Sequence, residues 1–293
     1  MGADAMKENG KEERRKKFLT VLENLCLLDD IFMTVVFQDS LACVDLVLQI
    51  ILNNPRLKTE KVVTQDTMKN LQGRGVRLDI HAFADGQEFD VEIQRAEKGA
   101  SPRRARYNSS LMDANALPAG DSYEDLPESY VIFITETDVL GDGKPLYEIE
   151  RTIKGSNRAF GDGTHILYVN SSIIEEDTPL GKLMHDFRCS DPEAMYYDIL
   201  AERTRYFKQE EKGVASMGMT MEAFMSEARA IAREEGREEG REEGREEGRE
   251  EGRESERLFS IRNLMKNLEW TAEKAMDALA IPKSEQGRYK ALL

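Results

Sequence analysis

The sequence predicts an α/β domain followed by a helical extension. Short apolar stretches typical of buried strands lie among stretches with helical spacing between residues 18 and 212. A charged repeat with regular glycines then precedes a last helical stretch. At 293 residues the chain has room for one sizeable core and an appendage. We therefore expect four parts: a polar N-terminal segment (1–17), the α/β domain (18–212), a linker with the repeat (213–257) and a small helical tail (258–293).

The elements of the domain follow from periodicity and from turn residues. Helical spacing predicts helices over 18–28 and 31–52, and a short strand is expected at 62–65. After a hairpin, the remaining elements are a helix over 103–117, strands at 130–135, 146–153 and 165–170, and helices over 179–187 and 192–211. The strands at 130–135 and 165–170 are almost entirely apolar, which is typical of the centre of a sheet.

A β-hairpin is predicted over residues 78–94. Apolar and polar residues alternate on both sides of Asp85-Gly86, a dipeptide that favours a type I′ turn because both of its positions need positive φ. This turn sets the register of the opposed residues: Ala84 with Gln87, His81 with Asp90, Asp79 with Glu92, and Arg77 with Gln94. Opposed Cβ atoms lie roughly 4.5 to 5.5 Å apart, so two carboxylates face each other.

These two carboxylates indicate a phosphodiesterase site that uses a single metal ion. Asp79 and Glu92 are hard oxygen ligands suited to Mg²⁺, and the Ile93 carbonyl can complete the inner shell. A metal-bound water would attack phosphorus, and Gln94 would orient it or hold a phosphate oxygen. The alternative is a solvated pair of acids on an exposed sheet face.

Composition limits the partners of the chain. A net charge of −15 argues against broad nucleic-acid affinity, but residues 56–110 hold eleven Lys and Arg against eight Asp and Glu. The three cysteines are widely spaced and favour buried thiols in a reducing cytoplasm. The N-terminal stretch resembles neither a signal peptide nor a membrane span, so we expect a cytoplasmic protein without a membrane partner.

The repeat Arg-Glu-Glu-Gly runs from Arg233 to Gly252. Each Glu-to-Arg pair three residues apart adds about 0.2 to 0.5 kcal/mol to a helix, whereas each glycine costs about 0.8 to 1 kcal/mol relative to alanine. An isolated helix here is therefore expected to be marginal. Two interpretations stay open: a solvated spacer, or a homo-oligomer formed through residues 233–257, in which the glycines let helices approach closely.

The order of the motifs resembles the PD-(D/E)xK nuclease superfamily and, more narrowly, its Rpn-like family of recombination-promoting nucleases and transposases. The similar motifs are Asp79 with Glu92-Ile93-Gln94, and the stretches 30–37, 104–107, 130–134 and 163–170. The resemblance covers about residues 25–210. It implies a restriction-endonuclease-like α/β core, with a central mixed sheet flanked by helices, and Mg²⁺-dependent DNA cleavage.

The resemblance also implies roles for single residues. Asp79 and Glu92 stand for the motif acids, and Gln94 stands where the superfamily has lysine. Asp30 is the candidate for a further acidic ligand, with Asp45 as the alternative. Residues at the start of the following helix are expected to contact phosphates next to the metal: Arg103, Arg104, Arg106 and Tyr107. The alternative is a helix start that is simply solvated.

Gln94 carries no positive charge, so another cation is needed at the site. Lys98 and Arg95 are candidates, but Arg95 is expected on the opposite face and Lys98 beyond the strand. His81 is expected to be a hydrogen-bonded neighbour of the acids. Glu88 and Asp90 are expected to be surface charges.

The expected function is a Mg²⁺-dependent DNA endonuclease, with Mn²⁺ as a substitute, acting in recombination, mobile-element movement or defence. RNA stays open as a substrate. The alternative is a weakly active or inactive protein with the nuclease fold that binds nucleic acid or supports oligomeric assembly.

Overall fold

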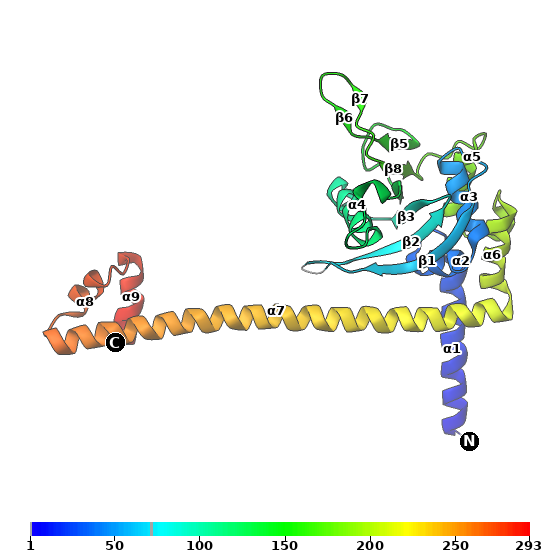
Figure 1. Cartoon of the computed structure of the whole chain (residues 1–293). Helices are drawn as coiled ribbons and strands as arrows, with labels where there is room; N and C mark the ends of the chain where they lie inside the picture. Colours follow the sequence, from blue (N-terminus) through cyan, green and yellow to red (C-terminus); the bar gives the residue numbers. More distant parts are fainter. Residues whose placement is uncertain (1, 71–72) are drawn as a thin grey trace. The chain divides into compact units, whose positions relative to one another are not determined.

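The computed structural model describes residues 2–70 and 73–293 (Figure 1). The chain divides into two compact units, Met1–Phe224 and Met225–Leu293. The four-part division expected from the sequence stays a prediction.

A six-stranded mixed sheet forms the centre of the first unit (Figure 1). Strands β1, β2 and β3 are antiparallel, β3, β4 and β8 are parallel, and β5 runs antiparallel to β8. In sheet order the strands are β1 (Thr59–Met68), β2 (Val76–Ala84), β3 (Gln87–Gln94), β4 (Ser129–Thr135), β8 (Thr164–Asn170) and β5 (Leu146–Ile149). Two short strands, β6 (Thr152–Ile153) and β7 (Arg158–Ala159), pair separately. The predicted α/β fold with a mixed central sheet is confirmed.

Helices cover both faces of the sheet. On one face the apolar side chains of β2 to β4 and β8 join those of several helices in the main core, which includes Phe32, Val47, Phe187 and Leu200. On the other face, Ala105 and Met112 of α4 pack on Val131 and Phe133 of β4. The helices are α1 (Gly2–Asn24), α2 (Asp30–Phe37), α3 (Leu41–Ile51), α4 (Pro102–Ala116), α5 (Pro179–Arg188) and α6 (Asp198–Gln209).

No single helix among the described residues is long and apolar enough to cross a membrane. The bent pair α2 and α3 passes this test only when both helices are taken together, and apolar residues of both belong to the main core. Cys26 and Cys43 are buried free thiols, and Cys189 is a half-buried one.

The hairpin of β2 and β3 has the predicted turn. Asp85 and Gly86 have φ values of 51° and 75°, Ala84 lies opposite Gln87, and His81 lies opposite Asp90. The paired stretch ends with Ile80 opposite Val91, so the predicted pairs of Asp79 with Glu92 and Arg77 with Gln94 do not continue the ladder.

The reason for this early end lies in strand β2 itself. Ile80 packs in the main core, whereas Leu78 belongs to the cluster beneath α4. The predicted alternation, which placed Leu78 and Ile80 on one face, is therefore wrong at this point. The strand changes face at Asp79, and the Asp79 carboxylate takes over the role of a ladder acceptor by receiving a hydrogen bond from the Ile93 N–H (2.9 Å).

The repeat segment is helical in the structure. Helix α7 (Glu211–Leu268) runs through the expected linker and through all five glycines of the repeat. At its end, α8 (Ala272–Ala278) and α9 (Lys283–Leu292) complete a small core of five buried side chains: Ile261, Ala275, Met276, Ile281 and Tyr289. The end of the second unit is thus helical and has a small apolar core of its own.

Candidate metal and nucleic-acid site

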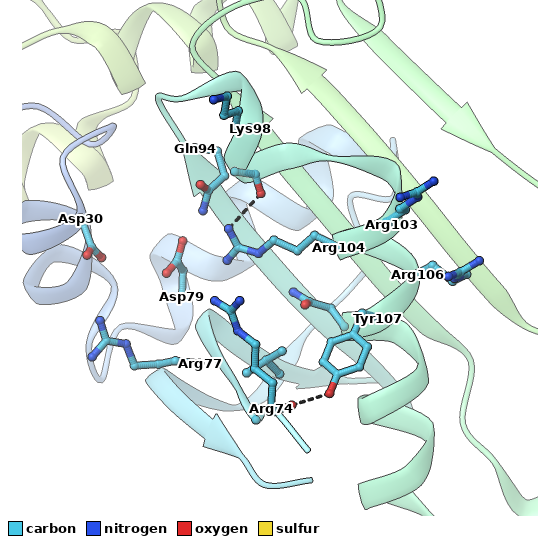
Figure 2. Close-up of a pocket in the computed structure, with 14 residues that line it drawn as sticks. Asp30, Arg74, Arg77, Asp79, Gln94, Lys98, Arg103, Arg104, Arg106 and Tyr107 are labelled. Atoms are coloured by element: carbon cyan, nitrogen blue, oxygen red, sulfur yellow. Dashed lines mark hydrogen bonds between the residues drawn. The ribbon is translucent and has the colours of Figure 1, made fainter. Parts of the chain in front are cut away.

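A cleft of about 910 Å³ lies between the hairpin and the start of α4 (Figure 2). Among the described residues, six basic side chains line it: Arg74, Arg77, Lys98, Arg103, Arg104 and Arg106. Asp30, Asp79, Gln94, Tyr107 and Asn108 line it as well. Figure 2 shows Arg104 directed inward toward Asp79 and Gln94, whereas Arg103 and Arg106 point away from these residues.

Asp79 and Asp30 are brought together by one side chain of β1. Gln65 donates from Nε2 to Asp30 Oδ1 (2.9 Å), to Thr34 Oγ1 (3.3 Å) and to Asp79 Oδ1 (3.4 Å). Gln65 has a φ of 55°, an uncommon conformation for a non-glycine residue in a strand that costs about 1 to 3 kcal/mol. Asp45 instead accepts from the Thr59 N–H (2.6 Å) outside the cleft, so the geometry favours Asp30 over Asp45 as the further acid.

Glu92 lies beneath Arg104. Its side chain is fully buried and forms an ion pair with Arg104 Nη2. Glu92 also accepts from Asn108 Nδ2 (3.2 Å) and from Gln94 Nε2 (3.3 Å). Arg104 Nη1 donates to the Gly99 carbonyl (2.9 Å), which fixes the guanidinium over the acid (Figure 2).

The absence of a side chain at Gly99 leaves room for the Gln94 amide. A Cβ atom added to Gly99 would lie 2.0 Å from Gln94 Oε1, so any larger residue would displace that amide. Lys98 lines the cleft nearby. Arg95 does not line the cleft; it pairs with Asp29 (3.2 Å) and contacts Cys26 Sγ (3.3 Å).

Asp90 and Glu88 are buried, so the prediction that they are surface charges is wrong. Helix α4 covers their face of the hairpin, and its Asn108 donates to Asp90 Oδ2 (2.9 Å). Asp90 Oδ1 is buried without a hydrogen-bond partner in the described part of the chain. Glu88 Oε1 lies 2.7 Å from His81 Nε2.

His81 is the hydrogen-bonded neighbour that the sequence predicted. Its other ring nitrogen, Nδ1, lies 2.7 Å from Asp66 Oδ2. Burial alone would lower the pKa of His81, but the hydrogen bonds to Glu88 and Asp66 outweigh burial and raise it. A positive imidazolium between two carboxylates is therefore favoured beside the acidic cluster.

Burial is the largest cause of the raised pKa values of three neighbouring acids, Asp79, Asp90 and Glu92. It raises the pKa of Asp79 to about 6 and that of Asp90 to about 7. The pKa of Glu92 is raised to about 10, because the charges of Asp90 and Asp79 add to the effect of burial, although Arg104 opposes them. Crowded acids of this kind favour either a proton or a cation.

The metal-free protein is expected to be more stable near about pH 5 than near about pH 8. Between the unfolded Asp pKa of about 3.9 and the folded values of about 6 for Asp79 and about 7 for Asp90, the folded state binds more protons than the unfolded state. The free energy of unfolding therefore falls as pH rises through this window. The raised pKa of His81 acts in the same direction, since its contribution is lost as pH rises.

Thermal denaturation in EDTA at the two pH values measures this difference. The variant Asp90→Asn removes one of the raised carboxyl groups, so it should reduce the difference in Tm. A Tm of the unaltered protein that is equal or higher at the alkaline pH would contradict the expectation.

The donor set suits a hard divalent cation. Mg²⁺ is usually held by one or two carboxylates and keeps several waters. Asp79 and Glu92 are two such acids, and burial, followed by the charges of neighbouring acids, raises the pKa of both. In a strand the N–H and C=O of one residue point to the same side, so the Ile93 carbonyl lies on the side of Asp79. Among the described residues, no group of three or more His, Cys, Asp and Glu side chains is arranged to hold a metal ion.

Three contributors were missed by the sequence analysis: Gln65, Arg104 as the partner of Glu92, and Asn108. Arg104 and Asn108 are four residues apart, which places them on one face of α4. That spacing is a usable signal, but only the packed structure shows that this face meets the hairpin. Gln65 gives no comparable signal, because its role depends on its unusual backbone conformation.

Residues 47–178 match the family described as PD-(D/E)XK nuclease family transposase. The matched segment contains β1 to β4, α4 and most of the cleft, whereas Asp30 lies before it. No curated protein and no solved structure matches the chain.

Proposed function

We propose that the chain is a member of the family of PD-(D/E)XK nuclease family transposases, whose description residues 47–178 match, and that it is a divalent-metal-dependent DNA endonuclease. The observation that carries the proposal is the composition of the cleft: the half-buried acids Asp30 and Asp79 lie beside six basic residues, and one of these, Arg104, covers the buried Glu92. Acids of this kind suit a cation, and the basic residues suit a phosphate backbone. The proposed cofactor is Mg²⁺, with Mn²⁺ as a substitute.

In the proposed site, the Asp79 and Glu92 carboxylates and the Ile93 carbonyl would hold the cation, with Asp30 as a further acid. A bound divalent cation supplies Lewis acidity and makes a bound water more acidic. The Gln94 side chain, which packs against Gly99, would position water or a phosphate oxygen. Tyr107, Arg103 and Arg106 also line the cleft and would contact the phosphates from α4.

Arg104 supplies the positive charge that Gln94 lacks. Its guanidinium already lies against Glu92 and lines the cleft. A fixed cation beside the reacting phosphate stabilises the charge that develops there. Because Arg104 and a metal ion are both cations at Glu92, binding of the metal requires the guanidinium to shift toward the cleft.

Nicking of supercoiled plasmid by the purified protein tests the proposal. We expect cleavage with Mg²⁺ or Mn²⁺, none in EDTA, and a loss of activity in Asp79→Ala and Glu92→Ala. Glu60→Gln, an exposed acid on the same sheet, is the matched control and keeps full activity. Cleavage by Asp79→Ala and Glu92→Ala at the rate of the unaltered protein would refute the assignment. Cleavage assays with RNA substrates in parallel decide between DNA and RNA.

The proposed setting is recombination, mobile-element movement or defence in the cytoplasm. The family description supports a transposase-type role in general terms. Plasmid recombination frequency in cells that express the protein, compared with the Asp79→Ala variant, measures the first two of these roles.

A second candidate role is assembly through residues 233–257. The observation that favours it is that a Cβ atom added at any of the five repeat glycines would meet nothing within 4 Å: Gly236, Gly240, Gly244, Gly248 and Gly252. No packing contact in the described chain therefore requires glycine there, although each one costs a helix about 0.8 to 1 kcal/mol. Close approach of a second α7 helix would explain why these positions are glycine.

Replacing all five glycines by alanine is expected to stabilise α7 and to weaken self-association. Sedimentation velocity over a range of concentrations measures the association, and deletion of residues 233–252 should abolish it. Asp79→Ala is the control, because it alters the cleft and leaves the repeat intact. Unchanged sedimentation in the alanine variant and in the deletion would favour the solvated spacer.

A further inference from the structure

The end of the second unit has the layout of a three-helix DNA-binding module. Residues 258–268 of α7, then α8 and α9, surround the small apolar core, and four residues, 279–282, join the last two helices. Ala280 in this turn has a φ of 53°. Two helices joined by a short turn, with a third helix packed on them, is the arrangement in which DNA-binding modules present their last helix to the major groove.

Hydrogen bonds fix α9 relative to the turn. Gln286 is buried and donates from Nε2 to Asp277 Oδ1 (2.8 Å) and to the Ile281 carbonyl (3.0 Å). The Ile281 N–H donates to the Met276 carbonyl (3.0 Å). Because Gln286 and Tyr289 hold one side of α9 inside the unit, the opposite side of this helix is fixed in an outward position.

The outward side of α9 is basic. Its exposed residues are three cations, Lys283, Arg288 and Lys290, together with Ser284, Gly287, Ala291 and Leu292. The acid of this helix, Glu285, forms a half-exposed ion pair with Arg257 (2.9 Å). Residues 255–293 hold seven Lys and Arg against five Asp and Glu, in a chain with a net charge of −15. The local positive charge complements a phosphate backbone.

The ion pairs of this surface can be exchanged for phosphates. Arg288 pairs with Glu254 at 2.7 Å, and Lys290 pairs with Glu273, but the side chains of these cations are 71% and 46% exposed. Exposed pairs contribute little to stability, so a competing phosphate can replace the carboxylate at small cost.

Gly287 gives independent support for a partner on this side of α9. It lies within α9 on the exposed side, and a Cβ atom added there would meet nothing within 4 Å. Glycine weakens the interior of a helix, and no contact inside the unit requires it at this position. A glycine among exposed cations allows a partner to approach the helix backbone closely.

We propose that the outward side of α9 binds duplex DNA, with Lys283 and Arg288 on phosphates and the backbone at Gly287 close to the groove. This site is separate from the cleft of the first unit and does not depend on cleavage. It gives the chain a means of holding DNA independently of the residues that would cut it.

Binding of the full-length protein to a labelled pool of random duplex DNA, measured in EDTA over a series of salt concentrations, tests the proposal. The double variant Lys283→Gln/Arg288→Gln is expected to bind about tenfold more weakly and to reduce the slope of log K against log salt by about 2, since each phosphate contact contributes roughly 0.9. The control Arg14→Gln/Arg15→Gln removes two exposed cations of α1 and should leave both values unchanged.

Gly287→Glu separates loss of contact from loss of folding. Glutamate is a better helix former than glycine, so this variant keeps α9 folded while it adds bulk and negative charge to the binding side. We expect it to lose affinity as the double variant does. Unchanged affinity and salt slope in both variants would overturn the proposal and leave a protein partner as the occupant of this surface. Plasmid nicking by the same variants, which retain the cleft, reports separately on the proposed nuclease function.

Discussion

Glu92→Gln is expected to abolish metal-dependent cleavage while the protein stays folded. The substitution keeps the size of the side chain and the acceptor for Asn108, but it removes a proposed ligand of the cation. A metal ion contributes several kcal/mol to phosphodiester hydrolysis, and about 1.4 kcal/mol corresponds to a factor of ten in rate, so the rate should fall by at least about 1,000-fold.

The thermal stability of Glu92→Gln gives a second readout, which is not expected to fall together with the activity. Burial, together with the charges of Asp90 and Asp79, raises the pKa of Glu92 to about 10, so the neutral amide of Gln imitates the protonated acid that the metal-free protein favours. We therefore expect a Tm no lower than that of the unaltered protein. Glu88→Gln is the matched control, because Glu88 is buried on the same face of the same strand but contacts His81 outside the cleft. Loss of activity in Glu88→Gln to the same extent would show that a general disturbance of the strand is responsible.

Arg104→Gln is expected to reduce the cleavage rate by about 100-fold, the cost typical of removing one donor that stabilises a charged transition state. The same variant should need less Mg²⁺ for half-maximal activity. Removal of a positive charge next to Glu92 makes the site more negative and removes the competitor of the metal ion. A lower rate together with tighter metal binding is a combination that simple unfolding does not produce.

Rate measurements over a series of Mg²⁺ concentrations give both quantities. Arg104→Lys keeps the charge but loses the fork that joins Glu92 to the Gly99 carbonyl, so we expect partial recovery of the rate. Arg14→Gln is the matched control, because Arg14 is an exposed cation of α1 that does not line the cleft. A need for more Mg²⁺ in Arg104→Gln would contradict the proposed competition.

Local patterns in the sequence predicted the parts of the fold that depend on local chemistry. Asp85-Gly86 forms the expected turn, and the predicted helix over 103–117 corresponds to α4 at Pro102–Ala116. The long helix α7 was underestimated, because the cost of its glycines argued for a marginal helix.

The surroundings of the acids could not be predicted, because they depend on packing between distant segments. Asp90 has the same alternating pattern as an exposed strand residue, and only the placement of α4 over the hairpin buries it. The ion pair of Arg104 with Glu92 likewise requires two elements to meet. The face change of β2 at Asp79 leaves no trace in the polar and apolar pattern, so simple register arithmetic extended the ladder too far.

The central claim is that Asp79 and Glu92 share one divalent cation. Anomalous difference density in a crystal soaked in Mn²⁺ tests this most directly. We predict one peak in contact with both carboxylates, with the Arg104 guanidinium moved from Glu92 toward the cleft. No peak at these acids, with Arg104 still paired to Glu92 at saturating Mn²⁺, would contradict it.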